Sequence, residues 1–188
     1  MDGTPDTTLN GDGTLLIDSG GGTDVQRGLA VGPNEEWLLT GSSSISGNRE
    51  ASLYVLRSDG TPSGEFGSSG FTALAGPFDD IISDSLWLDD GSILVGGTLD
   101  DQGQGSTAEM FAARFTAAGA LDPTFGTGGI ARYAGNTRQL GWALAADSNR
   151  VFVGGTTWNG TNNDAIIVAW DTLGNLDTTW ATAGVAQI

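Results

Sequence analysis

The chain has 188 residues, 38% of them hydrophobic, and six tryptophans, which is enough to bury a core. Its 23 acidic residues oppose seven basic ones, all arginine, and a net charge of −16 disfavours nucleic acid and anionic membrane surfaces as partners. The absence of Cys, His and Lys excludes disulfides, Ser-His-Asp and Cys-His catalysis, Schiff-base chemistry and zinc sites built on thiolate or imidazole. The sequence contains no run of 18 apolar residues, so it predicts no membrane-spanning helix.

One unit recurs along the chain, and its clearest marker is a turn that begins with Gly and contains one apolar residue. The copies are GTPDTTLN from Gly3, GTPSGEFG from Gly60, GALDPTFG from Gly119 and GNLDTTWA from Gly174. Their spacings of 57, 59 and 55 residues make this an internal repeat rather than a chance similarity.

Each unit contains four short apolar runs that predict β-strands, because they are four to six residues long, rich in β-branched and aromatic residues, and bounded by Gly, Asp, Asn or Ser. In order within the unit, the runs are 28–31, 85–88 and 143–146; then 37–42, 93–98 and 151–156; then 52–57, 111–116 and 166–171; and last 13–18, 70–75, 129–134 and 184–188. No segment shows a sustained helical period.

Four-stranded meanders repeated at this spacing are typical of β-propeller blades. The sequence therefore predicts an all-β repeat domain with an N-terminal segment at 1–23 and blades at 24–78, 79–135 and 136–188, closed by oligomerisation or part of a larger propeller. The apolar residue of each turn is expected to pack between adjacent blades rather than against a ligand, since it recurs at one register; these residues are Leu9, Phe66, Phe125 and Trp180.

Three stretches carry a resemblance to a known repeat: DDGSILVGG at 89–97, FAARFTAAGALDPTFGTGG at 111–129 and IIVAWDTLGNLDTTW at 166–180. They resemble the delta-60 repeat, a bacterial β-propeller repeat; the similarity is strongest from 84 to 180, and 1–70 departs from the pattern because GTPSGEFGSSG lacks the Leu-Asp pair. The resemblance implies a propeller in a secreted or cell-surface protein and no catalytic residues. The polar, acidic N-terminus is unlike a secretory signal, so an extracellular protein would have had its signal removed.

The N-terminal segment adds a fourth-strand run that has no first three strands of its own: Thr14, Leu15, Leu16, Ile17 and Asp18. We expect this surplus strand to mediate assembly, either by completing a blade of a larger propeller, by closing a ring of two chains, or by adding to an exposed edge of another subunit to form a filament. The alternative that 1–23 is only a remnant of the repeat boundary stays open.

Other candidate sites are weaker. Trp158, in the loop 157–165, is a candidate contact for a glycan or a protein partner, and NGT at 159–161 is a glycosylation sequon. The connections 43–51, 99–109 and 157–165 are predicted to be the longest loops.

No cofactor is expected: Asp-rich turns at 10–14, 99–106 and 159–165 lack a full calcium-loop pattern. Acidic residues that recur before each third strand, at Glu50, Glu109 and Asp164, are expected to accept hydrogen bonds from loop backbone.

Three hypotheses for function follow. The first is a non-catalytic structural protein that associates with itself, as a subunit of an extracellular filament or surface structure. The second is an extracellular module that binds a glycan or a protein. The third is a glycosidase, which needs only two suitably spaced carboxyl groups and so is compatible with the residue types present.

Overall fold

The computed structural model describes residues 3–19, 22–45, 47–103 and 107–188, and all regular secondary structure in this part of the chain is β-strand. The first sheet contains β1 (Asp24–Val31), β2 (Trp37–Ile45), β3 (Asn48–Leu56) and β4 (Phe71–Leu74). The second contains β5 (Asp79–Trp87), β6 (Ile93–Asp101), β7 (Glu109–Phe115) and β8 (Ile130–Tyr133). The third contains β9 (Gln139–Ala146), β10 (Arg150–Trp158), β11 (Asn163–Asp171) and β12 (Val185–Gln187). The prediction of an all-β chain of four-stranded antiparallel repeats is confirmed.

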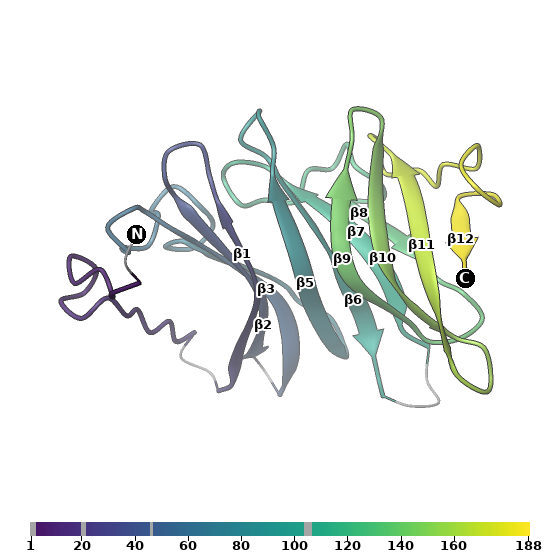
Figure 1. Ribbon diagram of the computed structural model, residues 1–188, viewed down its shortest axis with the longest axis horizontal. Coiled ribbons are helices and arrows are strands. Elements are labelled where there is room, and N and C mark those ends of the chain that lie inside the picture. Colours follow the sequence, from purple (N-terminus) through teal and green to yellow (C-terminus); the bar gives the residue numbers. More distant parts are fainter. Residues whose placement is uncertain (1–2, 20–21, 46, 104–106) are drawn as a thin grey trace.

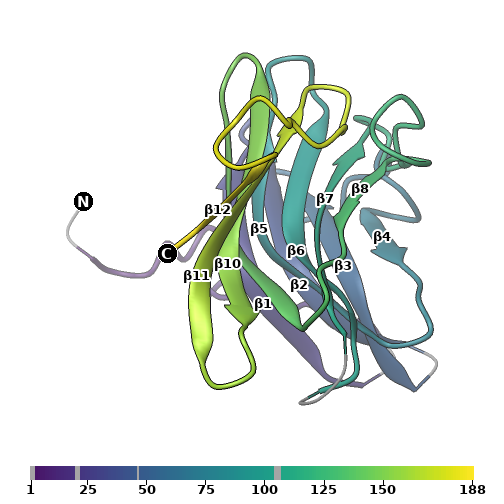
Figure 2. The same cartoon turned by 90° about the vertical axis from the view of Figure 1, so that its right-hand side faces the viewer.

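Every sheet is a simple meander in which consecutive strands pair. The first and second strands are joined by tight turns, whereas the third and fourth strands are joined by the long connections 57–70, 116–129 and 172–184. The three sheets stand side by side in chain order, so that the N-terminal segment lies at one end of the molecule and β12 at the other (Figure 1). A view from the C-terminal end shows the third sheet in front of the other two (Figure 2). The first and last sheets therefore each have a neighbour on one side only.

Two apolar clusters hold the stack together, one between each pair of neighbouring sheets. The first cluster includes Leu38 and Leu53 of the first sheet with Ile93, Val95 and Phe111 of the second. The second cluster joins the opposite face of the second sheet to the third; its larger members are Leu94, Met110, Val153, Val168 and Trp170. Because strand side chains alternate between the faces, a sheet in the middle of the stack must be apolar on both.

Each first strand contains a β-bulge, at Gln26/Gly28, at Ile82/Asp84 and opposite Gly154/Gly155. The bulge presses the first strand against the second, where the equivalent residues are Gly41, Gly97 and Gly155. A Cβ at any of these positions would overlap the carbonyl oxygen of the first strand. This close approach explains a glycine at this position in all three repeats.

The turn aromatics pack between sheets, as the repeat predicts. Phe66 and Phe125 are fully buried, and each belongs to the apolar cluster that joins its own sheet to the next. The residue after each aromatic donates its backbone N–H to the turn of the following sheet, from Gly67 to the Ala118 oxygen at 2.9 Å and from Gly126 to the Leu173 oxygen at 2.7 Å. The turn is thus a joint between neighbours as well as an end to its own meander.

The prediction that long loops join the second and third strands is wrong. The second and third strands continue into the stretches predicted as long loops, so that 43–51, 99–109 and 157–165 contain strand residues as well as hairpin tips. In the first sheet the reason is visible in Ser43, whose hydroxyl lies 3.1 Å from both the Ser52 and the Tyr54 hydroxyls. A serine-rich stretch resembles a loop, but cross-strand hydrogen bonds satisfy its hydroxyls inside the sheet.

The surplus strand predicted at 13–18 does not form a strand in this structure. Residues 14–17 pair with no strand in the described part of the chain, because all three sheets already have four strands and a strand exists only beside a hydrogen-bonding neighbour. The segment lies alongside the first sheet instead (Figure 1).

The turn contacts between sheets predict a difference between two alanine substitutions. Gly119 and Gly91 both have φ of +80°, but a Cβ at Gly119 would lie 2.8 Å from the Gly67 nitrogen and 3.1 Å from the Phe66 ring, whereas at Gly91 it would meet only Ala117 at 3.5 Å. Gly91→Ala should lower the free energy of unfolding by about 1 kcal/mol through backbone strain alone. Gly119→Ala should cost about 1–3 kcal/mol more, because the first two sheets must separate.

Urea denaturation of both variants measures this difference. Equal losses for Gly119→Ala and Gly91→Ala would show that the turn does not join the sheets.

Candidate functional site

The stack ends in two sheet faces whose counterparts inside the stack are buried. We call the outer face of the first sheet, formed by Leu29, Val31, Trp37 and Leu39, the first-sheet face. We call the outer face of the third sheet, formed by Trp142, Phe152, Ile167 and Trp180, the third-sheet face. The two faces lie at opposite ends of the stack (Figure 1).

The first-sheet face is the one that meets a preceding sheet elsewhere in the stack. Leu29 and Val31 are 70% and 69% exposed, and Leu39 pairs with Leu29 across β1 and β2. The positions equivalent to Leu29 are Ser85 and Leu144, and both are buried against the neighbouring sheet. The sequence thus places aliphatic side chains where only an occupied interface would cover them.

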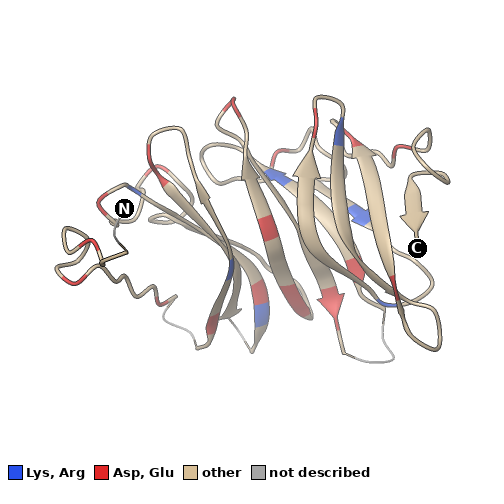
Figure 3. Ribbon diagram, in the orientation of Figure 1, with Lys and Arg blue, Asp and Glu red and all other residues tan. Residues whose placement is uncertain are grey.

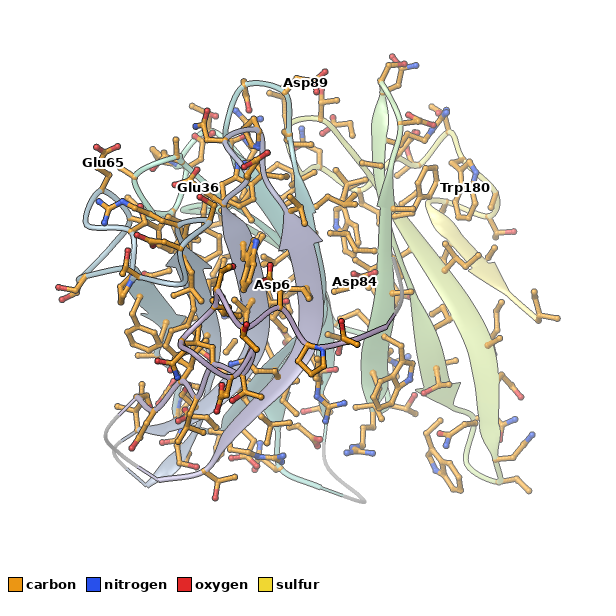
Figure 4. All side chains as sticks on the ribbon, turned by 60° about the vertical axis from the view of Figure 1, so that its left-hand side comes forward. Asp6, Glu36, Glu65, Asp84, Asp89 and Trp180 are labelled. Atoms are coloured by element: carbon orange, nitrogen blue, oxygen red, sulfur yellow. The ribbon has the colours of Figure 1, made fainter. Side chains whose placement is uncertain are left out.

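The third-sheet face is the one that meets a following sheet elsewhere. Ile167 is 36% exposed, whereas its equivalents Leu53 and Ala112 are fully buried between sheets. Trp180 occupies the position of Phe66 and Phe125 but is only partly buried, packing edge-on against Phe152 with ring centres 5.4 Å apart. Trp180 lies on the side of the molecule away from the N-terminal segment that carries Asp6 (Figure 4).

Two more tryptophans lie on the third sheet. Trp142, at the bulge of β9, is 48% exposed, and its indole N–H donates to the Thr156 hydroxyl at 3.4 Å. Trp158, the predicted partner contact, ends β10 rather than standing in a loop and is also partly exposed. The equivalents of Trp142 are Arg27 and Ser83, so the repeat pattern gave no signal for this aromatic, and sequence reasoning missed it.

The N-terminal segment covers part of the first-sheet face. Leu9 lies against Gly60, where a Cβ would stand 2.7 Å from a Leu9 methyl group, and Leu15 adjoins the same glycine. Leu15 and Ile17 also line a groove with Tyr54 and Leu56 of β3. The covered part is formed by β3 and β4, whereas Leu29 and Val31 on β1 remain exposed.

The predicted assembly residues thus divide into two sets. All three apolar residues line the groove, but Leu15 is 36% exposed and Ile17 is half-buried, whereas Leu16 is 90% exposed. The backbone of Thr14 bonds to the Asp12 carboxylate in a local turn. Asp18 ends the run and is exposed.

Most acidic side chains serve turns rather than a cleft. Asp6, Asp59, Asp122 and Asp177 each accept two hydrogen bonds, from the backbone N–H and the hydroxyl of the threonine two residues later. The threonine hydroxyl and then its N–H hold the pKa of Asp6, Asp59 and Asp122 below the ordinary range. Figure 3 shows the acidic residues spread over all three sheets and their loops, with no single concentration of charge.

The acidic residues before each third strand differ in role. Glu50 is buried and accepts the Gly76 backbone N–H at 2.8 Å, as predicted. Glu109 instead accepts from the Arg132 guanidinium at 3.2 Å, and Asp164 accepts from the side chain of Asn159 at 2.9 Å. The prediction of a common backbone contact is therefore right for one of the three positions.

Asp80 is the one carboxyl among the described residues whose pKa rises to about 6. It lies at the junction of the first two sheets, where burial is the main cause and the negative charges of Asp100 and Glu50 add to it. The Asp100 backbone N–H donates to it at 2.8 Å. The equivalent residue of the third sheet is neutral: Gln139, which accepts the Gly135 N–H at 2.8 Å.

Within the described ranges, no three His, Cys, Asp or Glu side chains gather in a way that would hold a metal ion. Of the Asp-rich stretches, 99–106 lies partly outside the described residues. The sequon at 159–161 is exposed at a hairpin tip, where the Asn159 side-chain oxygen accepts the Thr161 and Asn162 N–H groups. The part of the chain that is described contains no helix of the length and apolarity needed to cross a bilayer.

Comparisons with known proteins add no identification. No protein-family model matches the chain, and no curated protein matches it.

Asp80 predicts an unusual pH dependence of stability. Because its pKa is about 6 in the folded protein and near 3.8 when unfolded, ionisation opposes folding at pH 7, and this opposition is lost as the pH falls below 6 toward 4. Asp80→Asn should raise the free energy of unfolding at pH 7 by on the order of 1 kcal/mol. The gain should shrink as the pH falls through 6 toward 4, and it should vanish below the unfolded pKa of 3.8, where the wild-type carboxyl is protonated in both states.

The reciprocal change, Gln139→Glu, is the matched control, because it introduces a carboxyl at the same register of the third sheet. It should destabilise the protein more at pH 7 than at pH 4 in the same urea titrations. A stability gain for Asp80→Asn that does not change with pH would rule out a charge effect.

Proposed function

We propose that this protein is a non-catalytic assembly protein of β-propeller repeats, similar to the delta-60 repeat, that acts outside the cell by associating with itself. The observation that carries the proposal is that Leu29 and Ile167 are exposed at positions whose counterparts inside the stack are buried between sheets, with Val31 exposed beside Leu29 on the same face. The partner each face fits is another sheet of the same repeat.

The two faces are complementary to each other rather than to themselves. The third-sheet face is built like the surface that the second sheet offers to the third, and the first-sheet face like the surface that the third sheet offers to the second. A second copy therefore satisfies both faces by joining head to tail, continuing the stacking already present between the sheets of one chain. Head-to-tail contacts close into a ring when the rotation per subunit allows it and otherwise propagate as a filament.

The residue types also support a role without catalysis. The buried carboxyl of Asp80 accepts a backbone N–H of its own sheet, and Asp84 accepts the Leu144 N–H of the next sheet at 2.9 Å. These groups are used in joining strands and sheets. The high net negative charge would keep a β-rich protein soluble in extracellular or saline surroundings.

Head-to-tail association predicts that two defective variants complement each other. Leu29→Asp with Val31→Asp disables the first-sheet face, and Ile167→Asp disables the third-sheet face; all three side chains are exposed, so folding should survive. Each variant alone should be monomeric, with association weakened at least about 30-fold because a carboxylate must be buried in an apolar contact. Their mixture should form a 1:1 dimer and nothing larger.

Size-exclusion chromatography with light scattering measures these states, and negative-stain electron microscopy of the wild-type chain distinguishes a ring from a filament. A wild-type chain that stays monomeric contradicts the proposal. If Ile167→Asp prevents association while the Leu29→Asp, Val31→Asp variant still associates, the contact joins two third-sheet faces and the head-to-tail arrangement is wrong.

A second candidate function is binding of a glycan, favoured by the exposed pair Trp142 and Trp158 with the Thr156 hydroxyl bonded to one of them. Exposed indole rings offer flat apolar surfaces for sugar rings. In this case Trp142→Ala should abolish binding on a glycan array while leaving the thermal midpoint of unfolding within a few degrees. Trp170→Ala is unsuitable for comparison because that ring is buried; Leu173→Ala, which changes an exposed side chain on a turn, is the control.

A further inference from the structure

We propose that residues 6–18 of one copy replace residues 177–188 of another, so that 14–17 become the fourth strand of the other copy's third sheet in place of β12. This inference rests on the head-to-tail association proposed above and specifies how it takes place. The inference rests on the similarity of two segments, 6–18 and 177–188. When two copies dock head to tail, both segments would occupy the same place beside Gly60.

The two segments share the start and the end of one turn structure. Both begin with Asp-Thr-Thr, and in both the second threonine bonds to the aspartate through its N–H and hydroxyl, as Thr8 does to Asp6 and Thr179 to Asp177. Both then pass through positive φ at matching positions, 48° at Asn10 against 46° at Ala181. The glycine that starts the strand has φ of 81° at Gly13 and 90° at Gly184. Between these positions the segments differ, since the intermediate positive φ lies at Gly11 in one and at Ala183 in the other. Residues 6–18 thus have the start and the end of a sheet-ending turn, and no fourth strand of their own chain follows them.

The N-terminal segment also occupies the position that such a turn takes between sheets. Phe66 packs against Gly119 and Phe125 against Gly174, and Leu9 packs in the same manner against Gly60. If the third-sheet face of another copy docks on the first-sheet face with the geometry found inside the chain, its own turn and Trp180 must lie at Gly60. Leu9 already lies there, so one of the two turns has to leave.

β12 is the most weakly paired of the three fourth strands. It pairs with β11 through three residue pairs, whereas β4 and β8 pair through four. The incoming strand would match the same register, which places Leu15 opposite Ile167 where Ala186 stands now, and Ile17 opposite Ala165 beside the present Ile188. Leucine in place of alanine buries more apolar surface between the two copies.

The exchange loses little backbone hydrogen bonding. One fourth strand replaces another on β11, so the number of ladder bonds there is conserved, and the edge of 14–17 gains a partner that it lacks in the single chain. The net driving force is then the apolar area of the two open faces. This makes exchange and docking mutually dependent.

A disulfide lock tests the exchange in a chain that has no cysteine of its own. Ile167→Cys with Ala186→Cys places two cysteines at facing positions of β11 and β12, so that oxidation fixes β12 in its own chain. The oxidised protein should remain monomeric, and a reductant should restore association to the level of the Ile167→Cys single variant, because Ile167 itself belongs to the third-sheet face.

The matched control is Ala112→Cys with Ala131→Cys, the equivalent facing pair of β7 and β8, which is not exchanged. Its oxidation should leave association unchanged. If the oxidised β11–β12 lock still associates like the wild type, the strand exchange is wrong while head-to-tail docking stands. If the wild type, the reduced lock and the control all remain monomeric, the proposed function fails as well.

Cross-linking between copies tests the register. A chain with Leu15→Cys mixed with a chain carrying Ile167→Cys should give a disulfide-linked heterodimer on oxidation. Leu16→Cys is the control, because neighbouring residues of a strand point to opposite faces, and its yield should be at least about tenfold lower. Equal yields from Leu15→Cys and Leu16→Cys would contradict the proposed register, and association that strengthens on deletion of residues 1–18 would show that the N-terminal turn is the one that leaves.

Discussion

Each sheet in this protein is apolar on both faces, and this one constraint governs the rest of the structure. A surface meander with one polar face could stand at the end of a stack, but here the middle sheet presents Val95 to one neighbour and Leu94 to the other. The first and third sheets keep the same pattern on their outer sides, with Leu29 and Ile167 in positions that elsewhere are buried. Stacking is therefore both how the chain folds and why its ends remain unsatisfied.

The connection that follows the third strand holds neighbouring sheets at a fixed spacing. In the second sheet, Asp122 organises this turn by accepting hydrogen bonds from Thr124, and in the first sheet Ser63 takes its position. The aromatic of each turn, Phe66 or Phe125, then reaches the next sheet at a glycine too close for any side chain. Much of the acidity of the chain is explained by this local role and by ion pairs between sheets, such as Arg138 with Asp101 at 2.6 Å. Acidic residues distributed in this way stabilise turns and junctions, and they do not need a catalytic or metal site to account for them.

The sequence predicted the features that depend on the repeat and missed those that depend on a particular neighbour. Strand positions and the packing of Phe66 and Phe125 follow from a pattern present in every copy, so they could be predicted. The full length of β2 could not, because Ser43 looks polar until the hydroxyls across the sheet are known. The raised pKa of Asp80 depends first on its burial at the junction of two sheets and then on the charges of Asp100 and Glu50, and no local pattern indicates either.

The open position of residues 14–17 illustrates the same distinction. Their sequence is that of a fourth strand, yet a fourth strand pairs with the edge of a third strand, and in all three sheets that edge already carries β4, β8 or β12. A fourth strand in its own chain has the advantage of a high effective concentration, on the order of millimolar for a short connection, so a strand from another copy cannot displace β12 by hydrogen bonding alone. It can do so only when docking of the two open faces supplies the remaining free energy. Strand exchange and face burial would then occur together, which makes association cooperative and leaves the isolated chain protected by its own β12.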